Sequence, residues 1–309
     1  MKLFNILLHI WHKPVFKRAI LFFASLVPDK IYIQMTAKGK LGYSINLDTP
    51  LTFNEKLNWL KLYNRNPLYT RMADKYEAKG IVAERIGSQY VVRNLGCWQS
   101  FDDIDFDALP DRFVLKCTHD SSGAVICRDK RTFDRAAARK RISLTMQMNY
   151  FYACREWPYK NIPHRIIADE LLEEPGVASS PGTEAAPLND YKFWCFNGVP
   201  RYMYCTVKSN DVYENFYDMD FRVADIRHGF PRHIPEFERP EAFDEMRRLA
   251  ARLSEGIPFV RVDFFYVGGK IYFGEFTFFD WAGLQPFDDR QQDLDLGKLI
   301  TLSGEKIKD

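Results

Sequence analysis

One segment, residues 261–277, constrains the fold of this chain more than any other. It starts with RVDFFYV, which is rich in β-branched and aromatic residues, passes through Gly268 and Gly269, and returns as KIYFGEFT. Strand-forming residues on both sides of a two-glycine turn predict a β-hairpin. Similar runs joined by turn signals recur in the second half of the chain, so we expect sheets that are largely antiparallel.

The predicted hairpin brings four polar side chains together near its outer ends. Asp263 and Glu275 lie on adjoining strands, and period-2 alternation places Arg261 and Thr277 on the same face. Two neighbouring carboxylates repel each other and favour a cation between them. Carboxylate oxygens suit Mg²⁺, which often bridges to phosphate oxygens. The pattern predicts a metal site, although a surface strand with an ordinary salt bridge would contain the same residues.

Length and charge exclude several classes of protein. A chain of 309 residues can form one large or two medium domains. Its net charge of +2 argues against a dedicated nucleic-acid-binding protein. The six cysteines are widely spaced, with no CxxC pair, so the sequence does not predict a zinc site. Cysteines within apolar runs behave as small buried hydrophobes, which favours a reducing, cytoplasmic compartment.

The first 27 residues are apolar but are interrupted by Lys13, Pro14, Lys17 and Arg18. The uncharged run that follows is about half as long as a membrane span requires, and no small-x-small cleavage site follows it. One interpretation is a basic amphipathic segment that lies on the inner face of the cell membrane. The alternative is a helix packed on the protein's own core.

Helical periodicity and a capping signal predict the elements that precede the sheets. Thr52 and Glu55 have the spacing of a capping box at the start of a helix. A short strand is expected at residues 90–92. Further helices are predicted at residues 69–86, at residues 132–148 and after Pro240.

Three further segments carry residues that suit a nucleotide. Lys116 is near the end of a strand, and the backbone N–H groups of the following loop, residues 118–123, can hold phosphate oxygens. The apolar strand 165–172 leads to acidic residues that could meet adenine and ribose. In the third segment, Asp190 and Lys192 share one face of a strand, where the lysine could reach a terminal phosphate.

Each of these three segments also has a simpler interpretation. The first would be a solvated turn, the second an edge strand with solvated acids, and the third a cross-strand ion pair. The GxxxxGK[ST] pattern of a Walker loop does not occur in the sequence.

Taken in order, these segments resemble the ATP-grasp superfamily, and the hairpin is similar to the R-V-D-F…E-x-N segment of D-alanine–D-alanine ligases. More narrowly, the chain resembles the TupA-like ATP-grasp family, which is associated with teichuronopeptide and capsular polysaccharide biosynthesis. Four stretches carry this resemblance: TFNEKLNWLKLYNRNPLYTRMADKYEAKG (52–80), DFDALPDRFVLKCTHDSSGAVICRDK (105–130), DYKFWCFNGVPRYMY (190–204) and PFVRVDFFYVGGKIYFGEFTFFDWAG (258–283).

The resemblance implies an α+β protein with the ATP-grasp fold, in which two α/β lobes with largely antiparallel sheets grip ATP between them. The small lobe would cover residues 111–170, and the large lobe, with the catalytic hairpin, residues 171–309. They would be preceded by an amphipathic, basic helical segment at residues 1–30 and a small α/β lead-in region at residues 31–110.

The resemblance also implies roles for the residues that would bind ATP. Lys116 and Lys192 would bind its phosphates, and Glu170 and Leu172 would lie at the adenine and ribose hinge. The loop that folds over the phosphates would consist of Asp120, Ser121, Ser122 and Gly123.

The hairpin would supply the metal ligands and a catalytic residue. Asp263 and Glu275 would bind Mg²⁺, and Thr277 stands where many ATP-grasp ligases carry a metal-binding Asn, so a second Mg²⁺ is not assured. Arg261 would stabilise the oxyanion of a tetrahedral intermediate. His119 could accept a proton from an amine, because histidine titrates near neutrality, although a surface loop histidine is the simpler interpretation.

The function implied is that of an ATP- and Mg²⁺-dependent ligase that joins a carboxylate to an amine through an acylphosphate. The substrates would be a uronic acid or another sugar-linked carboxylate and an amino acid or amine, in the biosynthesis of a bacterial surface polysaccharide. An ATP-dependent sugar phosphotransferase and a glycosyltransferase of polysaccharide assembly are the alternatives.

The acceptor sugar and the lids would involve two further parts of the chain. Aromatic side chains with arginine would suit an acidic sugar, and the same residues could equally belong to the core and its rim. The loops 118–123 and 173–189 are the expected lids. The candidate sugar-binding residues are Tyr213, Phe216, Tyr217, His228, Arg232 and His233.

Overall fold

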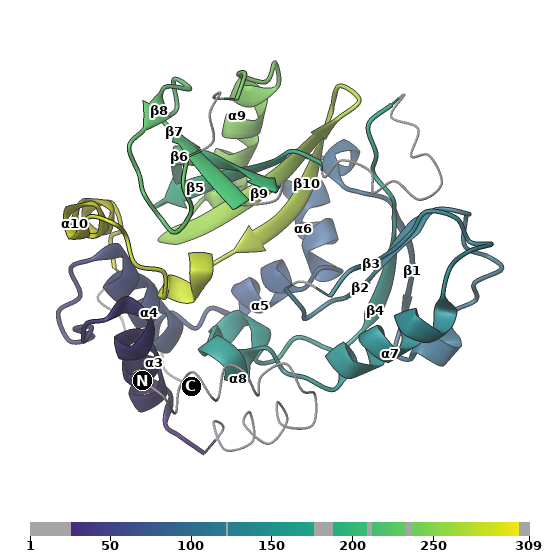
Figure 1. The fold of residues 1–309 in the computed structure, drawn as a ribbon, viewed down its shortest axis with the longest axis horizontal. Helices are drawn as coiled ribbons and strands as arrows, with labels where there is room; N and C mark the ends of the chain where they lie inside the picture. Colours follow the sequence, from purple (N-terminus) through teal and green to yellow (C-terminus); the bar gives the residue numbers. More distant parts are fainter. Residues whose placement is uncertain (1–25, 122, 176–187, 209–211, 233–236, 303–309) are drawn as a thin grey trace.

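The computed structural model describes residues 26–121, 123–175, 188–208, 212–232 and 237–302. Two antiparallel sheets dominate these residues, and helices cover them (Figure 1). The α-helices are α3 (Asp29–Leu41), α4 (Phe53–Tyr63), α5 (Pro67–Ala73), α6 (Glu77–Ile86), α7 (Arg135–Met146), α8 (Phe151–Cys154), α9 (Phe243–Ser254) and α10 (Arg290–Lys298). The 3₁₀-helices are η1 (Ser88–Tyr90), η2 (Phe101–Asp103), η3 (Trp157–Tyr159) and η4 (Asp280–Gly283).

The small sheet has the strand order β1-β4-β2-β3, with every neighbouring pair antiparallel. Helix α7 packs on β2, and Ile142 of this helix is buried with Phe113, Leu115 and Ile166 of the strands. The strand β1 comes from the region upstream of residue 110, so the chain enters this sheet earlier than residue 111. The strands are β1 (Asn94–Trp98), β2 (Phe113–Cys117), β3 (Val125–Cys127) and β4 (Ile166–Glu170).

The large sheet has the strand order β10-β9-β5-β6-β7-β8. Both predicted hairpins are confirmed, because Asn197 and Gly198 (φ 49° and 80°) turn β5 into β6, and Gly268 and Gly269 (φ 55° and 74°) turn β9 into β10. Left-handed backbone at both turn positions is the geometry of a type I′ hairpin. The strands are β5 (Asp190–Phe196), β6 (Val199–Lys208), β7 (Val212–Tyr217), β8 (Val223–Ala224), β9 (Phe259–Val267) and β10 (Lys270–Thr277).

Helices from both ends of the chain complete the core of the large sheet. The predicted capping box of α4 is present, since the side chain of Thr52 accepts from the backbone N–H of Glu55 and the side chain of Glu55 accepts from that of Thr52. The next residue, Phe53, is fully buried, stacks on Trp194 of β5 and meets Phe259 of β9 edge to face, with ring centroids 5.0 Å apart in each pair. The helices before residue 90 therefore share a core with the large sheet.

Two predicted elements differ in the structure. The single helix expected at residues 69–86 is two helices, because Asp74 accepts hydrogen bonds from the backbone N–H groups of Tyr76 and Glu77 and starts a new helix there. The strand expected at residues 90–92 is also wrong. A 3₁₀ turn occupies Ser88–Tyr90, and the strand follows at Asn94–Trp98.

The predicted amphipathic segment falls almost entirely outside the described residues, which begin at residue 26. Within the part of the chain that the structure does describe, no helix has the length and apolar character needed to cross a membrane.

Candidate active site

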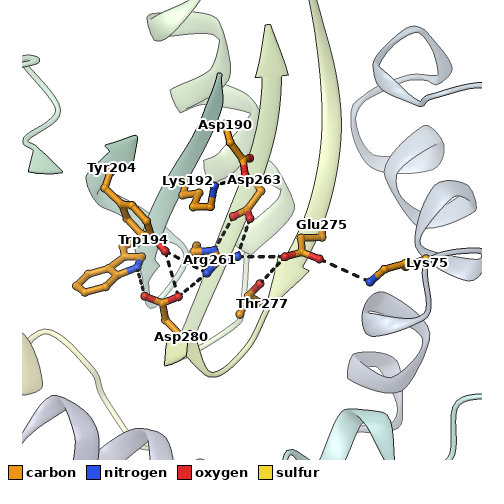
Figure 2. Close-up of polar contacts among 10 residues, drawn as sticks. All are labelled: Lys75, Asp190, Lys192, Trp194, Tyr204, Arg261, Asp263, Glu275, Thr277 and Asp280. Carbon is orange, nitrogen blue, oxygen red and sulfur yellow. Dashed lines mark hydrogen bonds and ion pairs between the residues drawn. The ribbon is translucent and has the colours of Figure 1, made fainter. Parts of the chain in front are cut away.

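The guanidinium of Arg261 is the centre of a network of carboxylates on the large sheet (Figure 2). Its Nε and Nη2 each donate to one oxygen of Asp263 at 2.7 Å. Nη2 also donates to Glu275 Oε1 at 3.1 Å. Nη1 donates to Asp280 Oδ1 and to the hydroxyl of Tyr204. Three carboxylates thus surround one cation whose geometry is fixed by charge-assisted hydrogen bonds.

The hairpin positions this network as alternation predicts, with one irregularity. Arg261 and Asp263 point to the same face of β9 and contact each other. The register of β9 with β10 shifts between Phe273 and Phe276, which sets Glu275 beside the other two. The expected juxtaposition of Asp263 and Glu275 is present, and the cation that contacts both is the guanidinium.

Asp280 is a site residue that the sequence analysis missed. It is fully buried, and its Oδ2 accepts from the indole N–H of Trp194 at 3.1 Å while Oδ1 accepts from Tyr204 at 3.3 Å. In the sequence, Asp280 is the single acid in the aromatic run FFDW. An acid among aromatic residues is expected to be buried, and a buried carboxylate must be paired. Asp280 holds the guanidinium of Arg261 from the side opposite Asp263.

Lys192 lies on the neighbouring strand β5, directly opposite Asp263 in the register. Its ammonium pairs with Asp190, which confirms that the two residues share a face. The side chain of Lys192 is 11% exposed, so it lies at the floor of the site rather than in open solvent.

Lys75, in the turn between α5 and α6, is a second residue that the sequence analysis missed. Its Nζ lies 3.6 Å from Glu275 Oε2 (Figure 2). Burial alone would raise the pKa of Glu275, and the positive charges of Lys75, Arg261, Lys192 and Lys116 outweigh it, so the pKa is lowered. Of these cations, Lys75 and Arg261 contact Glu275 directly, at 3.6 Å and 3.1 Å.

Lys116 lies on the small sheet and pairs with an acid of the neighbouring strand. Its Nζ lies 3.3 Å from Asp169 Oδ2, and Lys79 of α6 lies 3.1 Å from Asp169 Oδ1. Asp169 is buried on β4 and is the acid that faces these lysines, whereas the predicted Glu170 is exposed. Leu172 follows β4 and is half-buried. The structure thus brings Lys116 and the end of β4 together, with Asp169 and Lys79 as additional members.

The model of the TupA-like ATP-grasp family matches residues 55–301 of this sequence. The chain belongs to the TupA-like ATP-grasp family. The α+β class and the pair of antiparallel sheets expected from that resemblance are confirmed. None of the curated proteins matches the sequence.

Solved structures that are similar to this family member include three enzymes. The ATP-grasp ligase PsnB, complexed with a precursor variant, Mg and ADP, shares 13% identity over 69% of this chain and 52% of its own, with a TM-score of 0.38. D-alanine–D-alanine ligase from Bacillus anthracis, complexed with ATP, shares 14% identity over 67% of this chain and 54% of its own, with a TM-score of 0.39. The ADP complex of PurK, N5-carboxyaminoimidazole ribonucleotide synthetase, shares 14% identity over 72% of this chain and 50% of its own, with a TM-score of 0.40. The chain spans about half the length of these proteins.

The small-residue loop between β2 and β3 is folded back on itself. Asp120 Oδ1 accepts from the backbone N–H of Ser121 at 2.8 Å. The carboxylate of Asp120 lies where a Cβ atom at Gly123 would be, so a larger residue there would displace the Asp120 side chain. Ser122, and most of the second predicted lid at 173–189, lie outside the described residues.

The structure does not bring His119 into the Arg261 network. Its ring is buried and stacks on His164, with centroids 3.7 Å apart, and Nε2 lies 3.1 Å from the carbonyl oxygen of Thr145. Burial and the neighbouring His164 lower the pKa of His119 to about 4. The surroundings of His119 are those of a packed core residue and do not support its assignment as a general base.

The interpretation of the aromatic segment as a sugar pocket is also not supported. Phe216 and Tyr217 are buried, and His228 stacks on Phe287 with ring centroids 4.4 Å apart. Burial lowers the pKa of His228 to about 4. These side chains are core, as the simpler alternative predicts, and His233 lies outside the described residues.

Proposed function

We propose that the chain is an ATP- and Mg²⁺-dependent ligase that joins a carboxylate to an amine through an acylphosphate. The observation that carries the proposal is the contact of two cations from different segments, Lys75 and Arg261, with Glu275, next to a second carboxylate, Asp263, on the adjoining strand. Membership of the ATP-grasp family supports ATP as the molecule that these cations bind.

The donor set fits a nucleotide triphosphate with Mg²⁺. Lys75 contacts Glu275 from the turn between α5 and α6, and Lys116 lies on the small sheet, so a polyanion between the sheets would meet positive charge on both sides. Asp263 and Glu275 would hold the metal ion. Within the described ranges no three His, Cys, Asp or Glu side chains form a group that could hold a metal. Mg²⁺ usually takes one or two carboxylates and completes its shell with water and phosphate oxygens.

Three residues of the chain would have separate roles in the reaction. Bound Mg²⁺-ATP supplies an electrophilic γ-phosphorus and neutralises part of the charge that develops there. Lys116 and Lys192 would orient the phosphates. Arg261 would stabilise the negative charge that forms on the carbonyl oxygen when an amine attacks. Asp263 and Asp280 hold its guanidinium in place, and the N–H that Nη2 donates to Glu275 would have to be released to meet the oxyanion.

The proposed carboxylate substrate is a uronic acid or another sugar-linked carboxylate, and the proposed acceptor is an amino acid or amine. The association of the TupA-like family with surface polysaccharides supports this choice. We further propose that residues 1–27 bind the inner face of the cell membrane. Deleting them should release the protein from vesicles that contain anionic lipids without loss of soluble activity, whereas loss of the fold would contradict a membrane role.

Turnover with paired substrates tests the ligase function. The protein is incubated with ATP, Mg²⁺ and a panel of uronic acids and amino acids, and ADP and phosphate are measured. A ligase releases both only when a carboxylate and an amine are present together. Phosphate retained on the acceptor sugar would identify a phosphotransferase instead. Turnover of a nucleotide-sugar with no need for ATP would identify a glycosyltransferase.

A further inference from the structure

The turn after β10 presents an exposed tryptophan beside the candidate active site. Asp280, which opens the turn, is fully buried and binds the guanidinium of Arg261. The next residue, Trp281, is 42% exposed, and its ring lies 5.3 Å from the ring of Phe230. Adjacent Cα atoms are about 3.8 Å apart, so the chain passes from the buried Asp280 to the exposed Trp281 within one residue.

The backbone of this turn is strained. Trp281 (φ 48°, ψ 30°) and Ala282 (φ 55°, ψ 22°) both adopt the left-handed conformation, which is unfavourable for residues with a Cβ atom. Gly283 continues the turn with a φ of 58°. Glycine at the first two positions would remove the strain, so the bulky side chain at position 281 is not explained by the needs of the turn.

Two buried polar side chains of α4 hold the turn in place. Asn58 Nδ2 donates to the carbonyl oxygen of Gly283 at 2.7 Å, and Lys61 Nζ donates to that of Ala282 at 2.5 Å. Lys61 is 1% exposed, and burial lowers its pKa, so its position is itself unfavourable for a charged group. The fold thus maintains a strained turn with buried polar groups, and the outcome is an aromatic ring held at the edge of the site.

We propose that Trp281, with Phe230 beside it, is the surface on which the sugar ring of the carboxylate substrate stacks. This inference rests on the proposed ligase function and specifies its carboxylate substrate. One face of a pyranose ring carries C–H groups that pack against an aromatic ring, while its hydroxyls stay hydrated at the edge. Tryptophan offers the largest aromatic face. Asp280, which binds the guanidinium of Arg261, is the residue before Trp281, so a single residue connects the proposed sugar surface to that guanidinium.

Three substitutions at one position separate a binding role from a structural one. Trp281→Phe keeps an aromatic ring, Trp281→Leu keeps only apolar bulk, and Trp281→Gly removes the side chain and relieves the strain. The measurements are calorimetric titration with a glucuronic acid disaccharide, titration with ATP, and thermal unfolding. We expect Trp281→Phe to bind the disaccharide within about 2-fold of the wild type, and the other two variants to bind it about 3- to 10-fold more weakly. ATP affinity should be unchanged in all three.

The glycine variant gives the sharpest result. Because glycine accepts the left-handed conformation, Trp281→Gly should unfold at the same temperature as the wild type or at a higher one while it binds the disaccharide about 3- to 10-fold more weakly. A lower unfolding temperature would show that the ring is structural and would overturn the proposal. Unchanged disaccharide affinity, absence of disaccharide binding by the wild type, or a loss of amine affinity instead of sugar affinity would overturn it as well.

The same variants distinguish this proposal from that of the ligase. If Trp281→Gly loses the disaccharide while the wild type shows no ADP release with a carboxylate and an amine, the sugar surface stands and the ligase proposal fails. If ADP release requires both substrates and the KM for the carboxylate is unchanged in Trp281→Gly, the ligase proposal stands and the sugar surface fails.

Discussion

Lys75 Nζ lies 3.6 Å from Glu275 Oε2, and this contact joins the α5–α6 turn to the large sheet. The backbone N–H of the same lysine donates to the carbonyl oxygen of Thr118, at the end of β2 in the small sheet, at 3.1 Å. One residue therefore contacts both sheets at the place where their cationic side chains meet. Figure 1 shows α5 and α6 between the two sheets, which is the arrangement that allows this contact.

Replacing Lys75 by methionine should weaken ATP binding. The variant keeps the apolar stem but loses the ammonium, so the pKa of Glu275 should rise, since Lys75 is the charge that lowers it most. Loss of one hydrogen bond to a charged group predicts an ATP affinity that is about 10-fold lower or more, as measured by titration. The matched control is Lys30→Met, because Lys30 is exposed and its ion pair is with the exposed Asp48. Equal ATP affinities in the two variants would exclude Lys75 from the site.

Glu275→Gln tests the metal assignment. The substitution preserves the shape of the side chain and removes its charge, so Mg²⁺ would lose one of two carboxylate ligands. We expect turnover to fall at least about a hundredfold, the effect of losing one key transition-state interaction. Turnover is measured at saturating ATP, with thermal unfolding as the check on folding. A folded variant with unchanged ATP turnover would refute the assignment.

Thr277→Asn tests whether position 277 faces the metal ion. The hydroxyl of Thr277 lies 3.4 Å from Glu275 Oε1, and an amide oxygen is a better Mg²⁺ ligand than a hydroxyl. The Mg²⁺ concentration that gives half-maximal activity should therefore fall in the variant. Thr277→Val, which has no ligand atom, should raise that concentration. Identical Mg²⁺ dependence in both variants would place residue 277 outside the metal site.

The parts of the site that the sequence predicted are those fixed by local geometry. Alternation along β9 determines that Arg261 and Asp263 share a face, and the two-glycine turn pairs β9 with β10. Glu275 joins them only through the register shift between Phe273 and Phe276, which the turn does not specify. The core face of α9 could be predicted in the same way, since its apolar residues repeat at helical intervals within one segment.

The parts that were missed depend on packing between distant segments. Lys75 reaches Glu275 only because a new helix begins after Asp74, and Asp280 finds its partners on β5 and β6. No local pattern specifies either contact. His119 was predicted to be a site residue and is not one. Its residue type suits a catalytic base, but His164 packs against its ring and His119 is a buried core residue.

The stability of the protein should depend on pH through Glu214. This residue is 4% exposed, and burial, with a contribution from Asp280, raises its pKa to about 8 against the opposing charges of Arg261 and Lys192. A raised pKa means that the folded state binds the proton more tightly than the unfolded state. The stabilisation is complete below the ordinary value of 4.5 and is lost as pH rises toward about 8.

Glu214→Gln should therefore lose less stability than the wild type between pH 5 and pH 8.5. One unit of pKa shift corresponds to about 1.4 kcal/mol, so the difference is measurable by urea unfolding at several pH values. Some pH dependence should remain, since burial also raises the pKa of Glu156 to about 7. The control is Glu84→Gln, at an exposed position of α6. Parallel pH profiles for the wild type and Glu214→Gln would contradict the burial of an ionisable carboxyl there.

Phe53→Ala tests whether α4 is part of the core of the large sheet. Phe53 is fully buried against Trp194 and Phe259, and truncation would leave a cavity between the helix and the strands. The expected loss in the free energy of unfolding is about 3–5 kcal/mol, measured by denaturant titration. Leu51→Ala, two residues earlier and 65% exposed, should change it by less than about 0.5 kcal/mol. Equal losses in the two variants would mean that α4 does not pack on the sheet. In that case Asn58 and Lys61, which lie on the same helix, could not hold the turn that presents Trp281.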